Sequence, residues 1–234
     1  MPGPSRLVLL FLILFAGLVA AAAVERESLG DISHVNRSIH IDDGARAGKL
    51  STVNGAIVVG AEANIDSAET VNGAVRLGRA GRAAALETVN GSIVVGPDAV
   101  VTGSLQTVNG AIDLGESAEV QGDAENINGR VRLARKARVG GRITTYNGDI
   151  SVAESARAAA GITVKKSSGW SNWFGTQRRP LIRIGADAVV GDLHFEREVE
   201  LRVHPSARIG RVEGATALPL EQNDSSAAED ASGE

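Results

Sequence analysis

The sequence predicts an all-β protein whose chain winds as a single-stranded parallel β-helix, a β-solenoid. Asparagine recurs at intervals of 18 or 19 residues, and most of these asparagines stand between Val or Ile and Gly. A fixed period near 20 residues indicates a repeat architecture in which each unit packs on its neighbours. The seven asparagines are Asn36, Asn54, Asn72, Asn90, Asn109, Asn128 and Asn147.

Each unit, counted from its asparagine as column 1, contains three apolar segments. Columns 4 and 6 are aliphatic in every unit and column 5 is mixed, which is the alternation of a strand with one buried face. Column 12 and a later third segment are also apolar, and column 10 is nearly always Ala, which predicts a tight corner. In the second unit these inward positions are Ile57, Val59, Ile65 and Ala68. We therefore expect triangular rungs of three short strands, stacked ~4.8 Å apart as parallel strands.

The same period continues beyond the last asparagine, where Ile184 and Val203 are a further unit apart. Two more rungs therefore follow, and the total is about nine. Asn-Gly between apolar runs is also typical of β-hairpins, so a meander with two strands per unit is an alternative. The third apolar segment has no natural place in such a meander.

The N-terminus predicts export. Arg6 precedes an apolar run over residues 7–24, and Ala21, Ala22 and Ala23 supply an A-x-A-like cleavage site. We expect a periplasmic or cell-surface protein, the alternative being an inner-membrane anchor formed by residues 7–24. The expected divisions are a signal peptide (1–23), a lead-in or cap (24–35), the Asn-Gly solenoid (36–165), an aromatic insertion (166–178), two final rungs (179–214) and a disordered acidic tail (215–234).

Composition excludes several functions. The chain has no cysteine, so disulfides and Cys-zinc sites are ruled out, and its net charge of −4 gives no case for nucleic acid. None of the four histidines has a metal-ligand spacing, and no nucleophile elbow or phosphate-binding loop occurs. We expect no catalytic residues, no metal and no cofactor. A carbohydrate-active or acyltransferase β-helix enzyme is the less favoured alternative, because no aligned carboxylate pair or catalytic histidine is evident.

The asparagine column has a structural and a functional interpretation. In the first, the amides stack as a hydrogen-bonded ladder at a corner, and the following Gly supplies the positive φ that the corner needs. In the second, the seven aligned amides form a ligand-binding stripe. We favour the structural ladder.

The basic segment 130–142 follows an acidic unit. The acidic and basic residues fall in matched columns one unit apart, which predicts ion pairs on the outer face that fix the register of the stack. A binding patch is the less favoured interpretation. The expected pairs are Asp113–Arg132, Glu116–Arg135, Glu119–Arg138 and Asp123–Arg142, with Glu154 one unit beyond Arg135.

The aromatic insertion is the one irregular segment. It contains both tryptophans, and aromatic residues beside arginines are typical of binding hot spots. Contact with a membrane interface and folding back over an apolar face of the solenoid are the two alternatives. The candidate partner-binding residues are Trp170, Trp173, Phe174, Arg178 and Arg179.

The repeats TVNGAIVVG, TVNGAVRLG, TVNGSIVVG and TVNGAIDLG resemble the adhesin-like β-strand-repeat domains of unknown function in bacterial exported proteins. The later stretch IRIGADAVVGDLHFEREVELRVHPSARIG is similar to bactofilins, polymer-forming proteins built as right-handed triangular β-helices. These resemblances imply right-handed coiling. We expect a non-enzymatic solenoid with a structural or adhesion role at the cell envelope, whose partner is an unidentified envelope component or protein. The alternative is a bactofilin-like scaffold that polymerises end to end through the solenoid ends.

Overall fold

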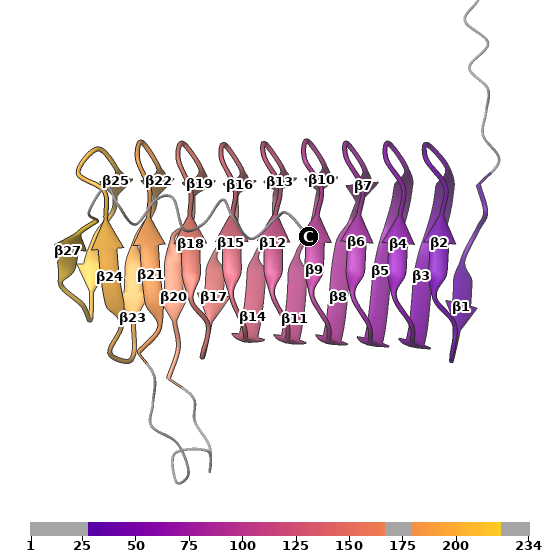
Figure 1. The fold of residues 1–234 in the computed structure, drawn as a ribbon, viewed down its shortest axis with the longest axis horizontal. Coiled ribbons are helices and arrows are strands. Elements are labelled where there is room, and N and C mark those ends of the chain that lie inside the picture. The colour runs from indigo at the N-terminus through magenta and orange to yellow at the C-terminus, as the bar shows by residue number, and fades with distance from the viewer. Residues whose placement is uncertain (1–27, 167–178, 221–234) are drawn as a thin grey trace, which may run out of the picture.

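The computed structural model describes residues 28–166 and 179–220. Within these ranges the chain contains strands and turns but no helix, and it winds into a parallel β-solenoid of about nine turns. Figure 1 shows the coils side by side in chain order along the long axis of the molecule. The predicted fold class is therefore confirmed.

One face of the solenoid is a ten-stranded sheet to which each coil contributes one strand. These strands carry columns 4 to 6, and they pair in register, so that Ile57 lies beside Val75 and Val75 beside Ile93. The strands are β2 (Ile39–Ile41), β4 (Ile57–Val59), β6 (Val75–Leu77), β9 (Ile93–Val95), β12 (Ile112–Leu114), β15 (Val131–Leu133), β18 (Ile150–Val152), β21 (Leu181–Ile184), β24 (Glu200–Val203) and β27 (Ala217–Pro219).

The remaining strands form a seventeen-stranded sheet over the other sides of the coil. They are β1 (Ile32–His34), β3 (Arg46–Asn54), β5 (Asn64–Asn72), β7 (Arg82–Ala83), β8 (Ala85–Asn90), β10 (Val100–Val101), β11 (Leu105–Asn109), β13 (Glu119–Val120), β14 (Ala124–Asn128), β16 (Arg138–Val139), β17 (Ile143–Thr145), β19 (Arg157–Ala158), β20 (Ile162–Val164), β22 (Val189–Val190), β23 (Leu193–Phe195), β25 (Arg208–Ile209) and β26 (Val212–Glu213). Every pairing between these strands is parallel, which excludes the hairpin meander.

The number of strands per coil differs from the prediction in the first two coils. There the second and third strands are fused into the nine-residue strands β3 and β5. A single residue, Ala84, separates β7 from β8 in the next coil, and three residues that include Gly103 separate β10 from β11. The 19-residue units therefore place their extra residue in a turn, whereas two of the 18-residue units continue as one strand and the third is interrupted only at Ala84.

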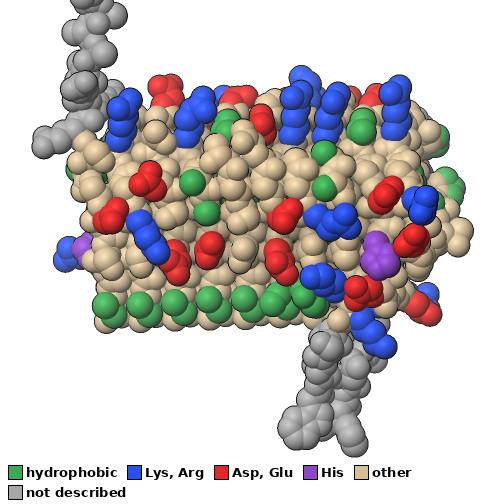
Figure 2. Space-filling view, turned by 180° about the vertical axis from the view of Figure 1, so that it is seen from behind, with side chains coloured by type: hydrophobic (Ala, Val, Ile, Leu, Met, Phe, Trp, Pro, Cys, Tyr) green, Lys and Arg blue, Asp and Glu red, His purple; other side chains and the backbone are tan. Residues whose placement is uncertain are grey.

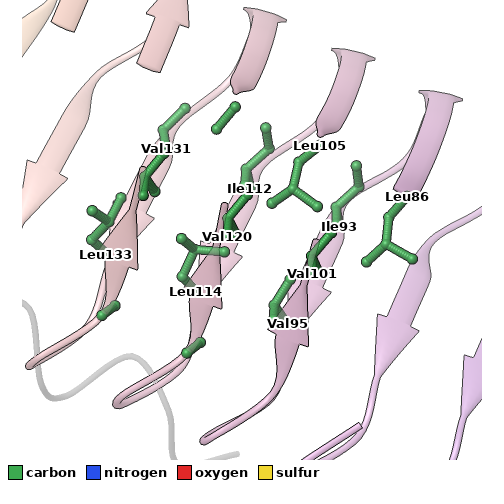
Figure 3. Packing of buried hydrophobic residues seen from close by; sticks show 14 of the residues in the cluster. Leu86, Ile93, Val95, Val101, Leu105, Ile112, Leu114, Val120, Val131 and Leu133 are labelled. Atoms are coloured by element: carbon green, nitrogen blue, oxygen red, sulfur yellow. The ribbon is translucent and has the colours of Figure 1, made fainter. Parts of the chain in front are cut away.

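The core is a narrow column of small aliphatic side chains, drawn for four coils in Figure 3. Columns 4, 6 and 12 and the third segment point inward, and their leucines, isoleucines and valines are almost completely buried through the middle coils. The corner alanines of column 10, such as Ala99 and Ala118, are fully buried as well. Near the C-terminal end Ile209 and Val212 are only partly buried, because no later strand among the described residues pairs with β25 or β26.

A left-handed residue turns the chain at the corner before those alanines. It occupies column 9 in consecutive coils, yet only the first described coil has a glycine, Gly44, at this position. Left-handed backbone is disfavoured for residues with a Cβ, so each such corner carries a local cost that the stacked coils around it overcome. The non-glycine members are Glu62, Ala80, Asp98, Ser117, Lys136, Ser155 and Asp187, with φ between 53° and 59°.

Candidate functional site

The asparagine column forms a continuous ladder along one corner of the solenoid. In each step Nδ2 of one asparagine donates to Oδ1 of the asparagine one coil earlier, at 2.8 to 3.0 Å. The ladder runs without interruption through Asn36, Asn54, Asn72, Asn90, Asn109, Asn128 and Asn147. The amides thus satisfy one another, and the structure places them as the structural interpretation expected.

An arginine closes the far end of this ladder. The Nη1 group of Arg197 donates to Oδ1 of Asn147 at 2.7 Å and to the backbone carbonyl of Tyr146 at 3.1 Å. Arg197 belongs to a coil that follows the insertion, so it joins the coils on the two sides of that segment. The repeat pattern did not predict this contact, because the two residues lie 50 positions apart.

The glycine that follows each asparagine has a different role from the predicted one. Gly55, Gly73, Gly91, Gly110 and Gly148 are not left-handed, and among these corner glycines only Gly129 has a positive φ, at 139°. Their common feature is close approach, since a Cβ on any of them would overlap backbone of the preceding coil, as at Gly91 against Gly73. The expectation of positive φ at this corner was therefore wrong for most coils. Glycine is needed because two backbones meet where no side chain fits.

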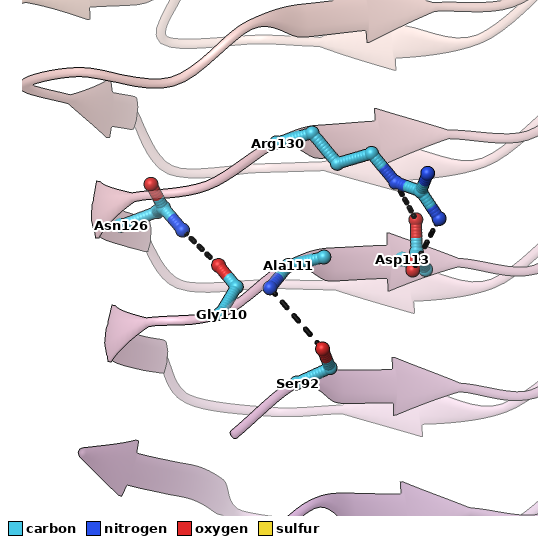
Figure 4. Close-up of polar contacts among 6 residues, drawn as sticks. All are labelled: Ser92, Gly110, Ala111, Asp113, Asn126 and Arg130. Carbon is cyan, nitrogen blue, oxygen red and sulfur yellow. Dashed lines mark hydrogen bonds and ion pairs between the residues drawn. The ribbon is translucent and has the colours of Figure 1, made fainter. Parts of the chain in front are cut away.

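A buried polar column lies directly beneath the ladder, and sequence reasoning missed it. The hydroxyl groups of Thr52, Thr70, Thr88 and Thr107 each donate to a backbone carbonyl at 2.9 to 3.0 Å. In the next coil Asn126 takes this place and donates to the carbonyl of Gly110 (Figure 4). One coil further, Thr145 donates to Oδ1 of Asn126 and accepts from the backbone nitrogen of Gly148. This column ties the corner to the coil interior.

The residue between the buried threonine and the asparagine points outward, and these residues form an apolar ridge. We define the apolar ridge as Val35, Val53, Val71, Val89, Val108, Ile127 and Tyr146. The side chain of Val35 is 63% exposed, and those of Val53, Val71 and Val89 are 40 to 41% exposed, although all are aliphatic. Figure 2 shows a row of apolar side chains along the corresponding edge of the molecule. The ridge carries no charge and runs parallel to the ladder.

The predicted ion pairs have different outcomes. Glu116 and Arg135 form an ion pair at 3.1 Å, as predicted. Asp113 binds Arg130 at 3.2 Å (Figure 4) and lies in backbone register with Arg132. Asp123 accepts from the backbone nitrogen of Arg142 at 2.7 Å and forms no ion pair with its guanidinium among the described residues. Asp113 and Asp123 thus lie in the predicted columns, and the contacts that the structure shows for them are with the Arg130 guanidinium and the Arg142 backbone.

The remaining predicted pairs are also absent from the described part of the chain. Glu119 lies in backbone register with Arg138, yet no ion pair joins them, and Glu154 forms none with Arg135.

Elsewhere Lys49 binds Glu69 at 2.8 Å, and this carboxylate raises the pKa of Lys49 through its hydrogen bond and its charge. The side chains are exposed, so such pairs contribute little to stability.

Most of the candidate partner-binding residues lie outside the described ranges. These are Trp170, Trp173, Phe174 and Arg178, while Arg179 forms an ion pair with Glu198 at 2.8 Å. Residues 1–27, with the apolar N-terminal run, and residues 221–234 also lie outside them. Across residues 28–166 and 179–220, no three His, Asp or Glu side chains gather in a way that could hold a metal ion. No membrane-spanning helix is found in these same ranges.

Comparison of the chain with protein-family models, with curated proteins and with solved structures finds no match. The class that the fold defines is therefore the parallel β-solenoid of about nine turns. The resemblance to adhesin-like repeats and to bactofilins has no matching family behind it.

Proposed function

We propose that the protein is a non-enzymatic, exported β-solenoid with a structural or adhesion role at the cell envelope, and that it contacts its partner through the apolar ridge. The observation that carries this proposal is the ridge itself. Exposed valines repeat there in four successive coils, partly exposed Val108, Ile127 and Tyr146 extend the row over the next three, and the Asn ladder holds the neighbouring positions in place. Contiguous apolar surface on a soluble protein typically marks an interaction site.

The geometry of the ridge favours binding over catalysis. Its neighbours are amides already bonded to one another and glycines without side chains, so the described ridge from Val35 to Ile127 presents no nucleophile, acid or base. Burial of apolar surface contributes about 25 cal/mol per Å², so a partner that covers several coils gains affinity from many small equal contributions. The apolar run at residues 7–24 and the resemblance to exported adhesin-like repeats support a place in the envelope.

Lysine substitutions along the ridge test the proposal. The variant Val53→Lys/Val71→Lys/Val89→Lys removes the apolar surface of three coils, because each side chain already points outward. The matched control is Val58→Lys/Val94→Lys/Val100→Lys, which places the same charges at partly exposed positions on other sides of the coil. Far-UV circular dichroism and thermal melting establish that both variants fold.

The measurement is co-sedimentation of the purified protein with envelope fragments of the source cells. We expect binding to fall at least tenfold in the ridge variant and to remain near the original value in the control. Equal binding by both variants would remove the ridge from consideration. Turnover of an envelope glycan by the purified protein, abolished by one polar substitution, would overturn the non-enzymatic part of the proposal.

A second candidate function is a self-assembling scaffold, and the solenoid ends favour it. Strands β2 and β27 are the two outer strands of the ten-stranded sheet, and each pairs on one side only among the described residues. Strand β27 is exposed along its length, with Leu218 at 52%. Unpaired edges can join end to end, although Pro219 removes one backbone donor from this edge.

Light scattering and electron microscopy of the full chain test end-to-end assembly. Filaments or a mass that rises with concentration support the scaffold, and Leu218→Lys is expected to shorten or abolish them. The ridge variant serves as the control, because it leaves both ends unchanged. A monomer at high concentration eliminates this function.

A further inference from the structure

A basic hollow lies at the corner that carries the left-handed residues. Its volume is about 380 Å³, and it spans three consecutive coils. Column 9 contributes Ser117, Lys136 and Ser155, and column 11 contributes Glu119, Arg138 and Arg157. Figure 2 shows Lys and Arg side chains along one edge of the molecule, with acidic side chains between them.

The three cations of this basic hollow have no polar partner among residues 28–166 and 179–220. The structure shows neither an ion pair nor a hydrogen bond from the side chains of Lys136, Arg138 or Arg157. The neighbouring Arg135, by contrast, binds Glu116. Three positive charges against the single carboxylate of Glu119 leave the lining with a net charge of +2.

The backbone holds these charges close together. Arg138 and Arg157 lie in register on the paired strands β16 and β19, so their Cα atoms are separated by one strand spacing of ~4.8 Å. Like charges directly opposite one another on a sheet repel, and an anion between them would remove that repulsion. Ser117 and Ser155 occupy the same left-handed corner position in the coils on the two sides of Lys136, so two hydroxyl groups line the hollow with it.

We propose that this basic hollow binds a tetrahedral oxyanion, the phosphate or sulfate group of a free ion or of a larger molecule. Two guanidinium groups offer paired N–H donors to such a group, Lys136 adds a point charge, and the serines complete the donors. The carboxylate of Glu119, which also lines the hollow, repels the anion and lowers the affinity of the site for it. The site is separate from the apolar ridge and does not depend on the proposed function.

The test is titration of the purified full chain with inorganic phosphate and with sulfate, at constant ionic strength set by chloride. Arginine Nε and backbone amide resonances report binding by NMR. We expect saturable shifts centred on Arg138 and Arg157, and at least a roughly tenfold loss of affinity in Arg138→Gln/Arg157→Gln. Glu119→Gln is expected to tighten binding several-fold, because it removes the opposing charge.

The matched control is Arg46→Gln/Arg82→Gln, which removes two arginines from the same column in coils outside the basic hollow. This control is expected to bind phosphate like the original protein. A thermal melt checks each variant, and Lys136→Gln serves as a second variant if the double arginine change unfolds the chain. Shifts that do not saturate, or equal losses in both arginine variants, would overturn the proposal.

Vesicles distinguish the source of the anion. Binding to phosphatidylglycerol vesicles but not to phosphatidylcholine vesicles, with the same loss in Arg138→Gln/Arg157→Gln, would assign the site to a lipid phosphate. Binding of inorganic phosphate without vesicle binding would assign it to a free or small-molecule anion.

Discussion

The corner glycines give the sharpest test of how the coils are held together. In Gly91→Ala the new Cβ would overlap the carbonyl oxygen of Gly73 in the preceding coil. The neighbouring atoms are backbone and cannot rotate away, so the two coils must separate at this corner. Two hydrogen bonds join these two coils at the corner: Gly73 N donates to Asn90 O at 3.1 Å, and Asn90 Nδ2 donates to Asn72 Oδ1 at 2.9 Å.

The magnitude follows from those two bonds. A net contribution of about 1 kcal/mol for each gives a loss of roughly 2 kcal/mol if both are broken. For a chain of this size such a loss lowers the melting temperature by about 6 °C. Gly185→Ala is the matched control, because its Cβ would lie no closer than 3.0 Å to any neighbouring atom, the carbonyl oxygen of Val152. We expect this control to cost less than about 1 kcal/mol.

The assay combines thermal melting followed by far-UV circular dichroism with hydrogen exchange of backbone amides. A solenoid is held by contacts between neighbouring coils, so the loss of protection in Gly91→Ala should be centred on the coils of Gly73 and Gly91 and decrease outward. If Gly91→Ala melts within a degree or two of Gly185→Ala, close backbone approach does not explain the conserved spacing of glycine in this chain, and the reasoning fails.

Four further changes probe other parts of the coil. Ala80→Gly relieves a left-handed corner and should stabilise the protein by about 0.5–1 kcal/mol in urea denaturation; a destabilised variant would contradict the strain assigned to column 9. Asn90→Ala breaks two ladder bonds and should cost about twice as much as Asn36→Ala, which breaks one, so equal melting temperatures would argue against the ladder as a source of stability. Thr145→Val removes a buried hydroxyl with two partners and should cost about 1–3 kcal/mol, which a denaturation midpoint unchanged from the original would refute. Because the pKa of Lys49 is raised above its ordinary value of 10.5, its ion pair contributes to stability below that value and is lost as pH rises above it; Lys49→Met should abolish this alkaline dependence, and an unaltered pH profile of melting would exclude the pair.

The arrangement of the coil could be predicted because burial follows directly from apolar spacing. Ile57, Val75 and Ile93 recur at one position of the repeat, and the structure stacks them in register. The extra residue of the longer units fell near Gly103, where the structure has a turn. The spacing could not show that the second and third strands of the first coil are fused into β3. A continuous strand and two strands joined by a turn place the same columns inward, so the apolar pattern is the same for both.

The surface could not be predicted to the same depth. Thr52 is buried and Val53 is exposed, the reverse of their hydropathy, because the threonine hydroxyl meets a backbone carbonyl inside the corner. A long arginine side chain can also extend to acceptors in more than one column. Matching residues one unit apart therefore could not predict that Asp113 binds Arg130. The same matching assigned Arg138 to Glu119, so a binding patch was the less favoured interpretation of segment 130–142.

The amide ladder has a direction. Every Nδ2 donates toward the N-terminal end, so Asn36 is left with an outward-facing donor and Asn147 with an outward-facing acceptor. Aligned amide dipoles of this kind polarise one another and leave partial positive charge at one end and partial negative charge at the other. The guanidinium of Arg197 stands at the negative end, as cations do beyond the last carbonyls of a helix. The two ends of the ladder are therefore electrically distinct even where their coils look alike.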